Sequence, residues 1–160
     1  MHIGKLKHDV NVSTAFMTLA KEDENAAEHL ASCQQYRHAC YFVIQAMEKF
    51  IRAKIFTLVN PNLEYFRDKN RTHSLESAVE FLIEIISDQQ VIRDQVSSQL
   101  KDHVLGITRY NALHNNLRYP SYSRRFDNYS ILQVHAEDYD RLKTRLHSLQ
   151  LFLKDLHRLT

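Results

Sequence analysis

The chain has only two glycines and two prolines among its 160 residues. An average globular chain of this length has roughly 19, at about 7% glycine and 5% proline. Because β-rich and dinucleotide-binding folds use these residues in tight turns and phosphate loops, the shortage disfavours both. With Gly4 and Gly106 as the only glycines, the chain has no Gly-x-Gly-x-x-Gly motif, no Walker loop and no Gly-x-Ser-x-Gly elbow. The composition predicts helices joined by few loops.

Length and composition match one ordinary globular domain. The 160 residues fall within the single-domain range, and 44% apolar with 25% charged residues is typical of a folded soluble chain. The formal net charge of +2 is small, so attraction to nucleic acid requires local clustering of cations. No stretch is apolar enough to span a bilayer, and residues 1–10 lead into no signal-peptide core. We expect a cytoplasmic protein without a membrane segment, with residues 1–12 as an N-terminal extension and residues 13–160 as one domain.

Apolar residues at helical spacing predict five helices. They cover about residues 13–34, 36–58, 74–87, 89–119 and 136–158. The second helix is apolar on nearly all sides, which places it at the centre of a bundle. Residues 59–73, with Pro61, form a polar connection, and residues 120–131 form a loop after Pro120. Gly106 lies inside the fourth predicted helix. The pattern predicts an all-α, up-and-down helical bundle.

The two cysteines give no disulfide and no metal site. Seven residues of helix separate Cys33 from Cys40 by about 10.5 Å, too far for a bridge, so we interpret both as small buried hydrophobes in a reducing compartment. His29 and His38 are their nearest potential co-ligands, but the four lie on two helices without the paired spacing of a tetrahedral site. We therefore expect no metal, and no cofactor.

Residues 109–125, RYNALHNNLRYPSYSRR, concentrate positive charge, since no acid occurs between Asp102 and Asp127. The cations are Arg109, Arg118, Arg124 and Arg125, and the interleaved tyrosines are Tyr110, Tyr119 and Tyr122, with Tyr129 following. Arginine binds phosphate oxygens and tyrosine stacks on unpaired bases, a mixture typical of single-stranded nucleic-acid binding. A solvated basic helix end explains the same composition equally well.

His114 lies in the middle of this segment and is a candidate general acid or base. If the ribose 2′-hydroxyl is the nucleophile, RNA cleavage needs no metal, and an arginine can stabilise charge on the phosphate. Asn111 and Arg118 share the helical face of His114, whereas Arg109 lies about 140° away on an ideal helix. Arg109 therefore meets His114 only if the helix is irregular near Gly106 or if a symmetric partner brings the two residues together.

Residues 15–55 resemble the first two helices of HEPN domains. Those domains show an aromatic residue and then a Gln-Ala-x-Glu-Lys-like core with a later Lys. The matching residues here are Tyr36, Ala39, Gln45, Ala46, Glu48, Lys49, Ala53 and Lys54. The helix start His73-Ser74-Leu75 and the entry to the last helix, VHAEDYDRL at residues 134–142, are also similar to the family. Arg109 and His114 fit the Arg-x(4–6)-His motif of many members, and the resemblance covers about residues 13–158.

The resemblance implies a metal-independent endoribonuclease, of the kind that acts as a toxin or defence effector, whose site forms when two copies bring their Arg-His motifs together. It implies His114 as the acid or base and Arg109 as the phosphate contact. From the spacing, Asn111 or Asn115 would orient His114 or the phosphate, and Arg118 and Tyr119 would bind substrate. The expected partners are RNA, a second copy of the chain, and an antitoxin or nucleotidyltransferase.

Two positions depart from the family pattern. Tyr110 follows Arg109, where active members often have a small polar residue. Asn115 and Asn116 follow His114, where members regulated by a nucleotidyltransferase antitoxin often have His-x-Tyr. The alternative is therefore a non-catalytic HEPN module that binds a nucleotide or a partner nucleotidyltransferase.

Glu48 and Arg52 are expected to form an ordinary i, i+4 helix pair, worth a few tenths of a kcal/mol and without a functional role.

Overall fold

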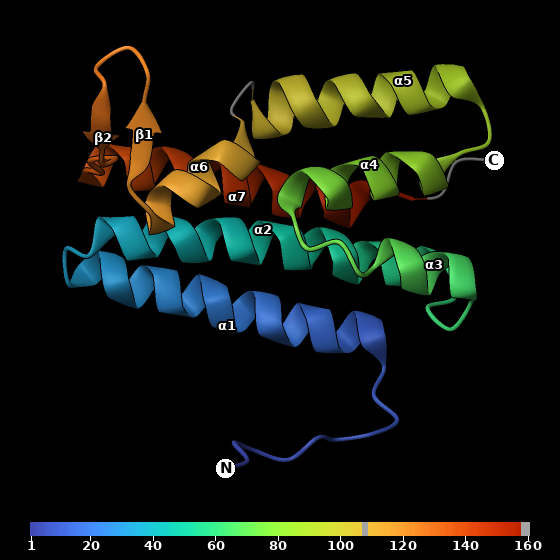
Figure 1. Cartoon of the computed structure of the whole chain (residues 1–160). Helices are drawn as coiled ribbons and strands as arrows, with labels where there is room; N and C mark the ends of the chain where they lie inside the picture. The colour runs from blue at the N-terminus through green and yellow to red at the C-terminus, as the bar shows by residue number, and fades with distance from the viewer. Residues whose placement is uncertain (107–108, 158–160) are drawn as a thin grey trace.

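The computed structural model describes residues 1–106 and 109–157, which form a helical bundle with one small hairpin (Figure 1). The elements in chain order are α1 (Val12–Ser32), α2 (Tyr36–Leu58), α3 (Glu64–Lys69), α4 (Leu75–Ile86), α5 (Gln90–Ser98), the π-helix η1 (Gln99–Leu105), α6 (Tyr110–Arg118), β1 (Ser121–Ser123), β2 (Asn128–Ser130) and α7 (Ala136–Asp155). The predicted all-α fold is confirmed. Residues 1–11 precede the first helix and are exposed.

Helix α2 is the centre of the bundle, as its all-round apolar pattern predicts. It packs along α1 on one side and against α4, α6 and α7 on the other (Figure 1). Its side chains Met47, Ile51 and Ile55 have no exposed surface. Full burial of a side chain of this kind stabilises a fold by about 1.5–3 kcal/mol. The buried leucine stripe of α7 faces it: Leu142, Leu146, Leu149 and Leu153. A helix anchored in this way provides a rigid support for any polar group on its remaining face.

The predicted fourth helix is divided, so the expectation of one helix over 89–119 is wrong. Its first part ends in the π-helix η1, and Gly106 follows with φ +77° and ψ 179°. This φ suits glycine alone, and a Cβ there would lie 3.3 Å from Nη2 of Arg145. The chain resumes helical structure at Tyr110, as α6. The chain is thus irregular at Gly106, which was one of the two conditions under which Arg109 could meet His114, while residues 107 and 108 lie outside the described part.

Helix α6 is fastened to α2 at its C-terminal end. Arg37 of α2 donates through Nη1 to the carbonyl oxygens of Asn116 (3.4 Å) and Leu117 (3.3 Å), and through Nη2 to that of Leu132. The last carbonyls of a helix lack intrahelical N–H donors, and this guanidinium supplies the missing hydrogen bonds. It also ties the chain that enters α7 to α6, which fixes the direction in which the α6 side chains point.

Two short elements appear where only loops were expected. Helix α3 lies within the 59–73 connection and has no buried residue, so apolar periodicity could not indicate it. Strands β1 and β2 form an antiparallel hairpin within residues 120–131, with Tyr122 opposite Tyr129. Their rings lie 5.6 Å apart at 72°. Three-residue strands are too short to show an alternating pattern.

The cysteine interpretation is half right. Cys40 is buried, and burial, followed by the charge of Asp138, raises the pKa of its thiol to about 12. Cys33 is exposed at the end of α1, so its assignment to the core is wrong. Both are free thiols. Among the described helices, none has the length and apolarity to cross a membrane.

Candidate functional site

His114 of α6 is half-buried against α2. Its ring stacks on that of Tyr41, with centroids 4.8 Å apart and an interplanar angle of 13°. One turn further along α2, Nε2 of Gln45 donates to Nε2 of His114 over 2.9 Å. Because an amide NH₂ group only donates, this bond requires a neutral ring that accepts at Nε2 and carries its proton on Nδ1. Stacking and hydrogen bonding together fix the ring against the rigid central helix.

The surroundings of His114 favour its neutral form. Burial lowers the pKa of the imidazole below its ordinary value, and the positive charge of Arg118 lowers it further, while the carboxylate of Glu48 opposes both. A neutral imidazole has one acceptor lone pair, here on Nε2, and in this structure that lone pair accepts from the Gln45 amide. His114 can therefore accept a proton only at Nε2, in place of the Gln45 amide.

Glu48 and Arg52 continue the polar face of α2 beyond Gln45. Arg52 donates through Nε to Glu48 over 2.9 Å, and their side chains are only 1% and 9% exposed. The expectation of an ordinary solvated pair is therefore wrong, since this pair is buried. Arg52 also donates to Oδ1 of Asn70 over 3.1 Å and to the carbonyl of Thr72. The pair thus fastens the segment before α4 to the central helix.

The start of α4 contacts both Glu48 of α2 and the first turn of α6. Nδ1 of His73 lies 3.9 Å from Oε1 of Glu48. Three residues later, the carboxylate of Glu76 accepts from the backbone N–H and the side-chain amide of Asn111, over 3.1 and 3.0 Å. Asn111 lies in the first turn of α6, where backbone donors lack helical partners, so Glu76 caps α6 from another element.

These contacts form a closed series across three elements, which we call the polar ring. Its members are Gln45 and Glu48 of α2, His73 and Glu76 at the start of α4, and Asn111 and His114 of α6. Each element contributes two residues spaced by three, and each joins the next through the contacts above. No acid was expected near residues 109–125 because none lies there in the sequence, yet α2 and α4 bring two carboxylates to it.

Arg109 lies apart from His114. It is the exposed residue that precedes α6, and it lines a cavity of about 530 Å³ together with Glu76 and Asn111. Among the described residues, no hydrogen bond and no shared cavity joins Arg109 to His114. The irregularity at Gly106 therefore does not bring the two residues into contact within one chain.

The other predicted substrate-binding residues are exposed around the end of α6. Arg118 donates through Nε to the carbonyl of His114 over 3.2 Å, and its guanidinium carbon lies 5.2 Å from the centre of the Tyr119 ring. Asn115 projects into solvent on the same helix. These side chains are accessible to a strand of nucleic acid.

Tyr110 does not belong with them. It is 3% exposed, its hydroxyl donates to the carbonyl of Leu105 over 2.7 Å, and burial raises its pKa to about 12. Its inclusion among base-stacking tyrosines is therefore wrong, because its ring is part of the core. A small polar residue at position 110 would leave unfilled the space in the core that the Tyr110 ring occupies.

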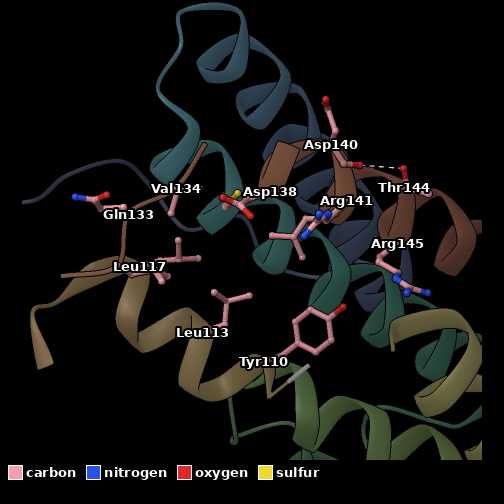
Figure 2. Close-up of a pocket in the computed structure, with 13 residues that line it drawn as sticks. Tyr110, Leu113, Leu117, Gln133, Val134, Asp138, Asp140, Arg141, Thr144 and Arg145 are labelled. Carbon is pink, nitrogen blue, oxygen red and sulfur yellow. Dashed lines mark hydrogen bonds between the residues drawn. The ribbon is translucent and has the colours of Figure 1, made fainter. Parts of the chain in front are cut away.

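A larger cavity, of about 710 Å³, lies between α6 and α7 (Figure 2). Tyr110, Leu113 and Leu117 form its α6 side, and Arg141 and Arg145 project from α7 in the same view. His114 does not line it. The apolar face of α6 therefore borders a cavity, while a different face carries the polar ring.

The chain matches the HEPN domain over residues 14–142. This stretch includes α1 to α6 and the first third of α7, and with them the whole polar ring. The chain belongs to the HEPN domain family. No curated protein and no solved structure matches it significantly. Within the described part of this HEPN chain, no group of three or more His, Cys, Asp or Glu side chains is placed to hold a metal ion.

Sequence reasoning missed several members of this site. Gln45, Glu48 and His73 stood among the positions that resemble HEPN domains, and the spacing of Gln45 and Glu48 along one face of α2 was a usable signal. Tyr41 and Glu76 carried none, because only the packing of α6 on α2 and α4 reveals them. The HEPN signature helix thus supports the histidine of a motif about 70 residues away.

Proposed function

We propose that the chain is a metal-independent endoribonuclease. The observation that carries the proposal is His114, a neutral and half-buried imidazole fixed by Tyr41 and Gln45 beside exposed arginines. Ribonuclease activity is common in the HEPN family. A fixed base at neutral pH is what the attack of a ribose 2′-hydroxyl on its own phosphodiester requires.

In this reaction the 2′-hydroxyl takes the place of the Gln45 amide at Nε2 of His114, which removes the hydroxyl proton. The oxygen attacks phosphorus, the bond to the 5′-oxygen breaks, and a 2′,3′-cyclic phosphate forms. Arg109 stabilises the negative charge that grows on the phosphate oxygens, which pre-placed cations do most effectively. Asn111 and Asn115 orient the reacting groups, and Arg118 with Tyr119 binds the flanking strand.

The active form is a homodimer in this proposal. Arg109 and His114 are separate within one chain, so the phosphate contact of one copy acts with the base of the other. HEPN domains commonly dimerise and bind RNA, which supports this arrangement. We assign the protein to the cytoplasmic toxins or defence effectors, with an antitoxin or nucleotidyltransferase as the controlling partner.

A second candidate function is that of a non-catalytic module that binds a nucleotide or a partner nucleotidyltransferase. The observation that favours it is the 710 Å³ cavity between α6 and α7, with an apolar floor and arginines at its rim (Figure 2). In that case the polar ring stabilises the fold alone, and purified protein binds RNA or a partner without cutting RNA.

Cleavage of mixed RNAs in the presence of EDTA tests the proposal. We expect the wild type to cut, and His114→Ala and Arg109→Ala to lose at least about 100-fold in rate while remaining folded and dimeric. His147→Ala, which removes an exposed histidine of α7, is the matched control and should keep wild-type activity. A requirement for Mg²⁺, or full activity in His114→Ala, contradicts the mechanism.

A further inference from the structure

The proposed reaction leaves one proton transfer unassigned, and the inference drawn here rests on that proposed function. His114 takes a proton from the 2′-hydroxyl, but the departing 5′-oxygen also needs one, because an alkoxide is a poor leaving group. Arg109 cannot supply it, since a guanidinium does not deprotonate in proteins. The site therefore needs a second group that gives up a proton near neutral pH, which is the ordinary property of histidine.

The polar ring presents such a group. His73 joins the ring through Glu48, at 3.9 Å, and Glu48 lies one turn from Gln45, which binds His114. A second route also leads from His73 to His114, since Glu76 lies three residues after His73 and binds Asn111, one turn before His114. Both imidazoles therefore lie beside the same polar face of α2, His73 next to Glu48 and His114 next to Gln45.

The remaining polar groups of the ring are already engaged. Glu48 is buried and accepts from Arg52, and Glu76 accepts twice from Asn111. The His73 side chain is 72% exposed, and its Nδ1 lies near the carboxylate of Glu48, which belongs to α2. Of the ring members in the described chain, His73 thus combines access to a bound strand with the ability to give up a proton. An imidazolium there would pair with the Glu48 carboxylate.

We propose that His73 is the general acid that protonates the leaving 5′-oxygen. His114 accepts the 2′-hydroxyl proton as the 2′-oxygen bonds to phosphorus, and the bond from phosphorus to the 5′-oxygen breaks. The His73 imidazolium gives its proton to that oxygen, so the products are a 2′,3′-cyclic phosphate and a free 5′-hydroxyl. His114 then returns its proton to water, and His73 takes one up, which restores the starting state.

A change of leaving group tests this assignment. Two substrates are compared: an oligoribonucleotide that the wild type cuts at one position, and the same strand ending at that nucleotide with a 3′-(4-nitrophenyl) phosphodiester. Nitrophenolate leaves without protonation, so an enzyme without its general acid still releases it. We expect His73→Gln to lose about 100-fold or more on the oligoribonucleotide and to stay within a few-fold of wild type on the nitrophenyl ester.

His114→Gln provides the comparison, because loss of the base should slow both substrates. Equal losses of His73→Gln on both substrates would make His73 a structural residue, and no loss on either would assign the acid to the partner's His114; each result overturns the proposal. A wild type that cuts neither substrate refutes the proposed ribonuclease itself. Thermal unfolding of both variants identifies any loss that comes from a damaged fold.

Discussion

The polar ring and the β1–β2 hairpin hold their side chains in opposite ways. In the ring, every member is held by a partner on another element, and the members range from buried Glu48 through half-buried His114 to exposed His73. In the hairpin, Arg124 and Arg125 are exposed, and the aromatic residue Phe126 beside them is 69% exposed. Both regions come from, or pack against, the stretch that is the most basic in the sequence.

In the proposed ribonuclease, this difference separates chemistry from binding. Proton transfer needs a fixed base whose pKa is set by its surroundings, and His114 in the ring is such a group. Backbone binding needs mobile cations and open aromatic faces that adapt to any base, which the hairpin and Tyr119 provide. Composition places Asn111 and His114 in the same basic segment as the hairpin arginines, whereas packing joins these two residues to α4 and α2.

The largest expected effect comes from removing the support of the ring. Arg52→Met leaves the Glu48 carboxylate buried without its partner and frees the segment that carries His73, which should cost about 3–5 kcal/mol of unfolding free energy. Arg71→Met is the matched control, because its pair with Asp68 is exposed and worth at most about 1 kcal/mol. Urea denaturation measures both, and equal losses would contradict the buried role of Arg52.

A smaller effect is expected where the ring touches the base. Gln45→Leu removes the donor to Nε2 of His114, so the proton of the neutral ring is no longer confined to Nδ1. We expect the rate of RNA cleavage to fall about tenfold, because one hydrogen bond is worth about 1–1.5 kcal/mol. ¹⁵N NMR of the histidine ring should show a changed tautomer, and Gln95→Leu, an exposed change on α5, should show neither effect.

The hairpin should respond differently. Removing two phosphate contacts with Arg124→Ala and Arg125→Ala together should weaken RNA binding a few-fold at low salt. The slope of log affinity against log salt should fall by about 1.4, at about 0.7 for each single-strand phosphate contact. Cleavage at saturating RNA should stay unchanged. A large loss in that saturated rate would place the hairpin in the chemical step and remove the contrast with the ring.

The smallest effect concerns pH and stability. Burial, and then Arg118, lowers the pKa of His114 below its ordinary 6.5, so the unfolded chain takes up a proton there before the folded chain does. Acidification from pH 7 therefore favours unfolding as pH falls through 6.5 towards the lowered pKa. His114→Gln should lose less melting temperature than wild type between pH 7 and pH 5. His147→Gln should behave as wild type. Identical losses of melting temperature in the wild type and both variants would contradict the lowered pKa of His114.

The sequence predicted the bundle well because helical periodicity and scarce glycine both report on the core. It indicated the central place of α2 and the irregularity at Gly106 for that reason. It could not indicate that Tyr110 is buried or that Glu76 caps α6, since both depend on how α6 packs after the chain breaks at Gly106. It also treated Glu48 and Arg52 as a surface pair, because i, i+4 spacing is the same on a buried face as on an exposed one.

A single altered ribose tests the central claim most directly. An oligoribonucleotide that the wild type cuts at one position is compared with the same strand whose ribose at that position is 2′-deoxy, both in EDTA. The account predicts a 2′,3′-cyclic phosphate end from the first strand, no cleavage of the second, and no cleavage of either by His114→Ala. Cleavage at the 2′-deoxy position would show that the 2′-hydroxyl is not the nucleophile, and the role assigned to His114 would then be wrong.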